Sequence, residues 1–182
     1  MNDSLAILEI KSIAKGFVVL DSLTKQAEVN VHIATFVSSG KFIIIFTGNI
    51  AEVEESFNNG LKQSKSQLID SLFLPQAHFS LILAIFGKFK HGNKEAIAII
   101  ETINVSTCIK AADKALKMTS VAIISMKLAN KIHGKGVFLL NGKLSEIEEA
   151  VNSIQCYIDS KKLIAVEIIT KFNLNIEGFF YF

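Results

Sequence analysis

Histidine, cysteine and carboxylate side chains are the groups in this chain that can support metal binding or acid–base catalysis. The histidines show neither an H-x-x-x-H motif nor a histidine–carboxylate spacing typical of a metal site; they are His32, His78, His91 and His133. Cys108 and Cys156 lie in helical patterns without a C-x-x-C spacing, which favours free thiols in a reducing compartment over a disulfide. The sequence therefore predicts no metal site.

Glu9 and Glu101 are the best candidates for paired catalytic carboxylates, because each occurs in a short apolar strand pattern. Their local sequences are similar, so a structural hydrogen bond made once in each strand explains them as well, and we favour that explanation. The other acidic clusters begin helices, where the helix dipole stabilises negative charge. Neither a G-x-G-x-x-G motif nor a Walker loop is present. We therefore expect that the protein is not an enzyme.

The elements that position these residues occur twice in the chain. Residues 40–57 read GKFIIIFTGNIAEVEESF and residues 134–151 read GKGVFLLNGKLSEIEEAV. Upstream of these segments, Glu9, Asp21, Lys25 and Val29 match Glu101, Asp113, Lys117 and Val121 at one constant spacing, which then grows by two residues. Self-similarity that keeps its register in this way indicates a duplicated domain. We expect a first domain at residues 1–90 and a second at 91–182.

Each half shows the same order of predicted elements: strand, helix, strand, strand, helix, strand. In the first half the strands are expected at residues 5–10, 29–36, 42–46 and 68–74, and in the second at 96–101, 121–128, 137–140 and 163–169. Ser12 is expected to cap the first helix, Asn49 the second and Ser145 the last. Residues 78–86 are expected to form a further short helix. This order predicts an α+β fold, a two-layer α/β sandwich in which two ferredoxin-like domains follow each other in tandem.

The composition narrows the possible partners. Half of the 182 residues are apolar, and all 19 cationic side chains are lysine. Without arginine the bidentate contacts that favour phosphate and base-edge recognition are missing, so we expect no nucleic-acid partner. No apolar run reaches the roughly 18 residues that cross a bilayer, and the polar start does not resemble a signal peptide, so we expect the protein in the cytoplasm.

The segments AILEIKSIAKG, DSLTKQAEV and TGNIAEV, and AIAIIET, AADKALKMTSV and NGKLSEIEEAV further on, resemble the shell-protein domain of bacterial microcompartments. The resemblance covers about residues 5–75 and 95–170, and the D-x-x-x-K-x-x-x-V spacing in both halves is its most specific part. Neither half resembles a circularly permuted domain, because the strand with Glu9 or Glu101 comes first. The whole chain resembles tandem-domain shell proteins of the propanediol type, which implies a homotrimer that imitates a hexagonal tile, packs beside other shell proteins and passes small metabolites.

The resemblance also implies roles for particular residues. Lys25 and Lys117 correspond to tile-edge lysines. Two loops correspond to the lining of the central pore; their residues are Val37, Ser38, Ser39, Gly40, Asn130, Lys131, Ile132, His133 and Gly134. Lys41 and Lys135 lie nearby, and we expect these lysines, with Lys131 and His133, to attract anions.

One departure from the family concerns the cofactor. A relative of this tandem type holds an iron–sulfur cluster through a cysteine in the first pore loop, where this chain has Ser38. A serine hydroxyl stays protonated and ligates iron poorly, so we expect no cluster and no other cofactor. Two alternatives to a structural shell protein stay open: a regulatory module that binds a small molecule between its domains, and an electron-relay shell protein. The apolar C-terminal residues 179–182 are expected either to cover their own domain or to contact a neighbouring subunit.

Overall fold

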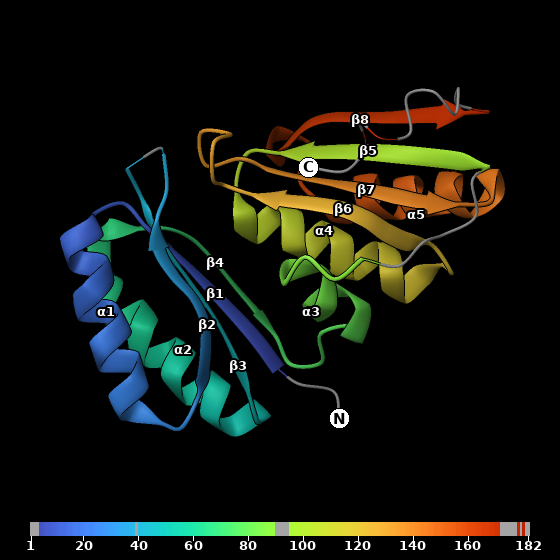
Figure 1. Ribbon diagram of the computed structural model, residues 1–182. Helices are drawn as coiled ribbons and strands as arrows, with labels where there is room; N and C mark the ends of the chain where they lie inside the picture. The colour runs from blue at the N-terminus through green and yellow to red at the C-terminus, as the bar shows by residue number, and fades with distance from the viewer. Residues whose placement is uncertain (1–3, 39, 90–94, 172–177, 179, 181–182) are drawn as a thin grey trace. The chain divides into compact units, whose positions relative to one another are not determined.

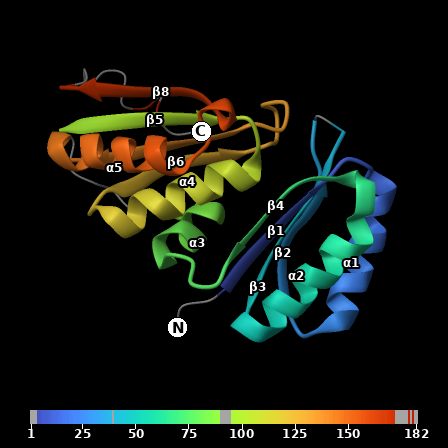
Figure 2. The same ribbon diagram turned by 180° about the vertical axis from the view of Figure 1, so that it is seen from behind.

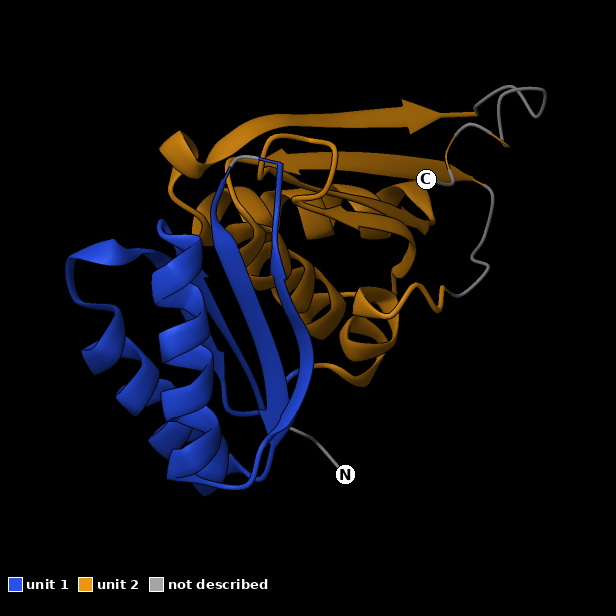
Figure 3. Ribbon diagram, turned by 60° about the vertical axis from the view of Figure 1, so that its left-hand side comes forward, with its two compact units in different colours: residues 1–77 blue, residues 78–182 orange. Residues whose placement is uncertain are grey.

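The computed structural model describes all residues except 1–3, 39, 90–94, 172–177, 179 and 181–182. The chain forms two compact units, residues 1–77 and 78–182 (Figure 3). This division comes before the short helix α3 (Phe79–Ile85), whereas the boundary expected from the sequence lay after it, at residue 90 within the polar linker of residues 87–94. Helix α3 contacts α4 (Val105–Met118) and β6 (Ala122–Leu128) of the second unit, which is why it belongs to that unit.

Both units have the predicted element order (Figure 1). The first contains β1 (Ser4–Ile10), α1 (Ile13–Gln26), β2 (Asn30–Phe36), β3 (Phe42–Gly48), α2 (Ile50–Ser64), the short 3-10 helix η1 (Lys65–Gln67) and β4 (Leu68–Leu74). After α3, the second contains β5 (Ala96–Thr102), α4 (Val105–Met118), β6 (Ala122–Leu128), β7 (Gly136–Gly142), α5 (Leu144–Tyr157), η2 (Ser160–Lys162) and β8 (Leu163–Thr170). The predicted fold is confirmed.

Each unit is a helical layer on an antiparallel sheet. The strand orders are β2-β3-β1-β4 and β6-β7-β5-β8, and in each unit the two long helices lie on the same face of the sheet (Figure 2). The register shifts fall at equivalent places, between Val31 and Ile33 in β2 and between Ile123 and Ser125 in β6. The duplication therefore extends to irregularities of the sheet, not only to the order of elements.

The local sequence explains the helix starts only in part. Ser12 caps α1, because its hydroxyl accepts a hydrogen bond from the backbone N–H of Lys15 at 3.2 Å. Asn49 occupies the N-cap position of α2 as predicted, but its side chain donates to Glu52 at 3.1 Å and makes no cap hydrogen bond. The predicted Ser145 cap is wrong, because α5 begins at Leu144, where Glu146 accepts from the backbone N–H of Lys143.

At one equivalent helix–strand contact, the two units place the small and the large residue on opposite sides. In the first unit Gly16, the fourth residue of α1, packs on the buried ring of Phe42, the first residue of β3. In the second unit the fourth residue of α4 is Cys108, which packs on Gly136, the first residue of β7. A Cβ added to Gly16 would lie 2.3 Å from Phe42 Cγ, and one added to Gly136 would lie 2.3 Å from Cys108 Cβ. Large and small residues have thus changed places between the repeats.

Candidate functional site: two hairpin loops and two helix ends

The first candidate pore loop is a tight turn between β2 and β3. The backbone N–H of Val37 donates to the carbonyl of Lys41 at 2.9 Å, and that of Gly40 donates to the carbonyl of Val37 at 2.8 Å. Gly40 has φ +78°, a conformation that glycine adopts without steric cost. Val37 is buried and Ser38 is exposed, while Ser39 lies outside the described residues. The described part of this loop presents a hydroxyl and no charge.

The second candidate loop, residues 129–134, joins β6 to β7 and is two residues longer. It closes with an equivalent hydrogen bond, from the Ala129 N–H to the Lys135 carbonyl at 2.8 Å. Three residues other than glycine have positive φ: Ala129 (56°), Lys131 (63°) and His133 (54°). Residues other than glycine adopt this conformation uncommonly, although asparagine, aspartate and histidine do so more readily than the rest, and such residues gather at functional sites. Ala129 and Gly134 are buried, Ile132 is half-buried, and Asn130, Lys131 and His133 are exposed.

A lysine–glutamate ion pair stands beside each loop. Lys41 Nζ lies 2.8 Å from Glu9 Oε2, and Lys135 Nζ lies 2.9 Å from Glu101 Oε1. The Lys41 and Glu9 side chains are 11% and 0% exposed, whereas those of Lys135 and Glu101 are 43% and 33% exposed. The recurring structural hydrogen bond expected for the two glutamates is thus present in both units. Because a carboxylate compensates each ammonium group, the two ion pairs argue against the expectation that Lys41 and Lys135 attract anions.

The candidate edge lysines lie in the last turns of α1 and α4, each bonded to the aspartate one turn earlier. Lys25 Nζ is 2.7 Å from Asp21, and Lys117 Nζ is 2.5 Å from Asp113. The Asp21 side chain is 64% exposed, but that of Asp113 is 7% exposed and also accepts the His78 backbone N–H at 2.8 Å. The start of α3 therefore fixes the second aspartate, while the first pair is open to solvent.

Two of the described histidines make local hydrogen bonds. His32 Nε2 lies 2.6 Å from Thr47 Oγ1, and His78 Nδ1 accepts the Ser80 backbone N–H at 3.1 Å at the start of α3. His91 lies outside the described residues, and His133 is in the second loop. Within the part of the chain that the structure describes, no three histidine, cysteine or acidic side chains are grouped as metal ligands.

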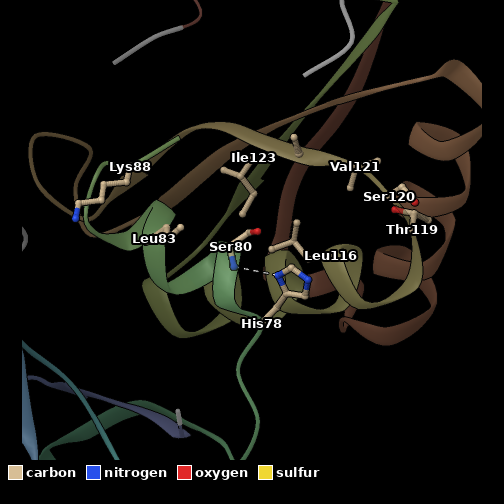
Figure 4. A pocket seen from close by; sticks show the side chains of 10 residues that line it. His78, Ser80, Leu83, Lys88, Leu116, Thr119, Ser120, Val121 and Ile123 are labelled. Atoms are coloured by element: carbon tan, nitrogen blue, oxygen red, sulfur yellow. Dashed lines mark hydrogen bonds between the residues drawn. The ribbon is translucent and has the colours of Figure 1, made fainter. Parts of the chain in front are cut away.

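A cavity of about 340 Å³ lies in the second unit beside α3 and the start of β6. In Figure 4 Lys88 is at one end, Thr119 and Ser120 are at the other, and the His78 ring lies between them. Among the described residues that line it, Lys88 is the only one ordinarily charged and none is acidic, so these residues do not supply the pair of carboxylates that acid–base catalysis would use.

The first loop does not fit an iron–sulfur cluster. Clusters are held by thiolates, and the loop offers the Ser38 hydroxyl. Cys108 is buried in α4, and Cys156 is exposed on α5. Both cysteines are thus outside the two loops.

The sequence did not reveal the ion pairs, although it held a signal for them. Glu9, Lys41, Glu101 and Lys135 all recur between the halves, but only the pairing of β1 with β3 and of β5 with β7 brings each lysine beside its glutamate.

Over the described residues, no helix is both long and apolar enough to span a membrane.

Comparisons with known proteins agree with this architecture. The model of the BMC domain matches residues 4–77 and again residues 96–172. The chain is 34% identical over 151 residues to the bacterial microcompartment shell protein PduT of Citrobacter freundii, covering 83% of this chain and 82% of that protein.

Two solved structures are similar as well. A microcompartment protein from Desulfitobacterium hafniense has a TM-score of 0.87 at 26% identity, with 98% of this chain and 99% of that chain covered. A fused, permuted, hexameric shell protein from the RMM microcompartment has a TM-score of 0.64 at 18% identity, with 85% and 80% covered, and shares the fold. The resemblance seen in the sequence and its unpermuted strand order are confirmed. The chain belongs to the BMC domain family and is a bacterial microcompartment shell protein with two such domains in tandem.

Proposed function

We propose that three copies of this chain form a ring of similar domains, a pseudohexameric tile of the microcompartment shell that passes small metabolites through a central pore. Its role is structural rather than enzymatic. A duplicated subunit can supply two near-equivalent sectors of such a ring, and repeated head-to-tail contacts close when the rotation fits. Other shell proteins would be its lateral partners, and enclosed enzymes would lie on one side of the tile.

A difference in burial between equivalent helix positions carries this proposal. Val105 and Ile109 of α4 are 0% exposed. Their counterparts on α1, Ile13 and Phe17, are 36% and 55% exposed. Large apolar side chains left bare on one repeat and covered on the other indicate a surface that another molecule covers. Since the two units share one fold, a second copy of the chain is the simplest cover for α1.

The pore would lie where the two kinds of loop meet around the axis. It would be lined by Val37, Ser38, Ser39, Gly40, Asn130, Lys131, Ile132, His133 and Gly134. The family resemblance and the equivalent hydrogen bonds that close both loops support this assignment.

Native mass measurement with negative-stain microscopy tests the tile. We expect trimers that associate laterally at modest salt and show a central depression. A sensor that binds a metabolite between its domains would instead give dimers or tetramers and a thermal shift with the metabolite, and that result would overturn the proposal.

Removing both edge lysines should weaken lateral assembly without dissociating the trimer. In the Lys25→Ala, Lys117→Ala double variant each aspartate partner stays at the tile edge without its cation. We expect sheets or tubes to disappear from electron micrographs at salt concentrations where the wild type forms them, while the native mass stays unchanged. Lys62→Ala, on α2, is the control. Unchanged sheets in the double variant would show that these lysines are not at the edge.

A further inference from the structure

We propose that the second loop makes the pore selective for small oxyanions, metabolites that carry a carboxylate or phosphate group, and that Lys131 and His133 attract them. The inference rests on the proposed function, because it needs the loops to surround the axis. It names the chemical class that such a pore would favour.

The strand lysines near the loops cannot supply the selectivity. Lys41 and Lys135 are each within 3 Å of a glutamate oxygen, at 2.8 and 2.9 Å, so neither adds an uncompensated charge to the loops. Lys131 differs, because no ion pair is found for it among the described residues, and the same holds for His133. The positive charge near the loops is therefore concentrated at the tip of the second one.

Hydrogen bonds within the backbone of the second loop position these two residues. The Gly134 and Ile132 N–H groups both donate to the Ala129 carbonyl, at 3.1 and 3.3 Å, and the Lys135 N–H donates to the Ile132 carbonyl at 3.1 Å. These bonds fix Lys131 and His133 in the left-handed conformation that their side chains disfavour. Both remain exposed. The hydrogen bonds thus fix the backbone positions from which the two side chains extend.

The first loop differs from the second in charge. Its described residues carry no charge, and Ser38 offers a hydroxyl that hydrogen-bonds either sign of ligand. Around a trimer axis the neutral and basic loops would alternate. A narrow opening ringed by one sign of charge raises the local concentration of the opposite ion. Lysine ammonium and histidine N–H groups donate to carboxylate and phosphate oxygens, which selects oxyanions over neutral metabolites.

A crosslinking experiment tests the location by itself. We would place Asn130→Cys in a Cys156→Ser background of the full chain and treat the assembled protein with a short bis-maleimide. Copies joined through residue 130, with no joining of a Lys62→Cys control, are expected if the loops converge. Absence of crosslinks would overturn both the pore assignment and this inference.

A titration with inorganic phosphate tests the selectivity. Phosphate binding to the assembled protein is followed by ³¹P NMR line width, with glycerol, followed by ¹H NMR, as the uncharged probe. Lys131→Asn suits the positive φ, because asparagine tolerates that conformation. We expect it to weaken phosphate binding about tenfold, the lower end of the enrichment that a focused field produces. Lys131→Arg should retain binding, and Lys62→Gln should leave it unchanged.

A failure of the selectivity can be told apart from a failure of the proposed pore. Crosslinking through residue 130 together with equal phosphate binding by the wild type and Lys131→Asn would overturn the selectivity while leaving the tile intact. The same conclusion would follow if phosphate and glycerol bound equally, or if phosphate did not bind. Acetate in place of phosphate shows whether a single carboxylate is enough.

Discussion

Replacing Lys41 with methionine should lower the free energy of unfolding by about 3 to 5 kcal/mol, the usual effect of removing one partner of a buried ion pair. The Glu9 side chain is 0% exposed, so its carboxylate would lose its cation without gaining water. The matched change, Lys135→Met, breaks a half-exposed pair, and about 1 kcal/mol or less is expected there. Urea unfolding of the assembled protein at one fixed concentration measures both.

A second substitution distinguishes a buried charge from lost packing. If an uncompensated carboxylate causes the loss, Glu9→Gln in the Lys41→Met background should recover much of it, because the amide carries no charge. Equal losses for Lys41→Met and Lys135→Met would contradict the explanation, since the two pairs differ chiefly in exposure.

Gly16→Ala should destabilise the first unit by about 3 kcal/mol, the upper part of the usual range for overpacking a core. The new methyl group would lie 2.3 Å from Phe42 Cγ, and the ring is fully buried and cannot move into solvent. In an unobstructed helix the same change stabilises by about 1 kcal/mol. The sign of the effect therefore tests the contact, and thermal or urea unfolding can measure it.

Phe42→Gly supplies the matching double-mutant cycle. It removes both the ring and the Cβ of Phe42, which would lie 2.3 and 2.5 Å from the new methyl group, so Gly16→Ala should cost much less in the Phe42→Gly background than alone. Additive losses would show that the crowding lies elsewhere.

The fold could be predicted because the sequence states it twice. Where one half was ambiguous, the other half repeated the pattern, and apolar periodicity separated helices from strands. Features set by distant contacts could not be read in this way. The polar linker suggested that α3 closes the first domain, but its hydrogen bond to Asp113 and its packing on β6 place it in the second unit.

The candidate loops and edge lysines could be named from the sequence, but the charge partners near them could not. Similarity to the family picked out the loops and the edge lysines, and the D-x-x-x-K spacing already placed each aspartate one turn before its lysine. The ion pairs of Lys41 and Lys135 were missed because a sequence does not give strand register.

The exchanged contact, glycine on phenylalanine in one repeat and cysteine on glycine in the other, bears on how a tandem protein avoids misassembly. Similar neighbouring domains can trade elements while a nascent chain folds. Here α4 seated on β3 would drive Cys108 into Phe42, and α1 seated on β7 would leave two glycines facing an empty space. Each helix therefore packs well only on its own sheet. A chain in which gene conversion had copied one half over only part of the other would be destabilised by the same mismatch. This helps to keep the two halves distinct over evolutionary time.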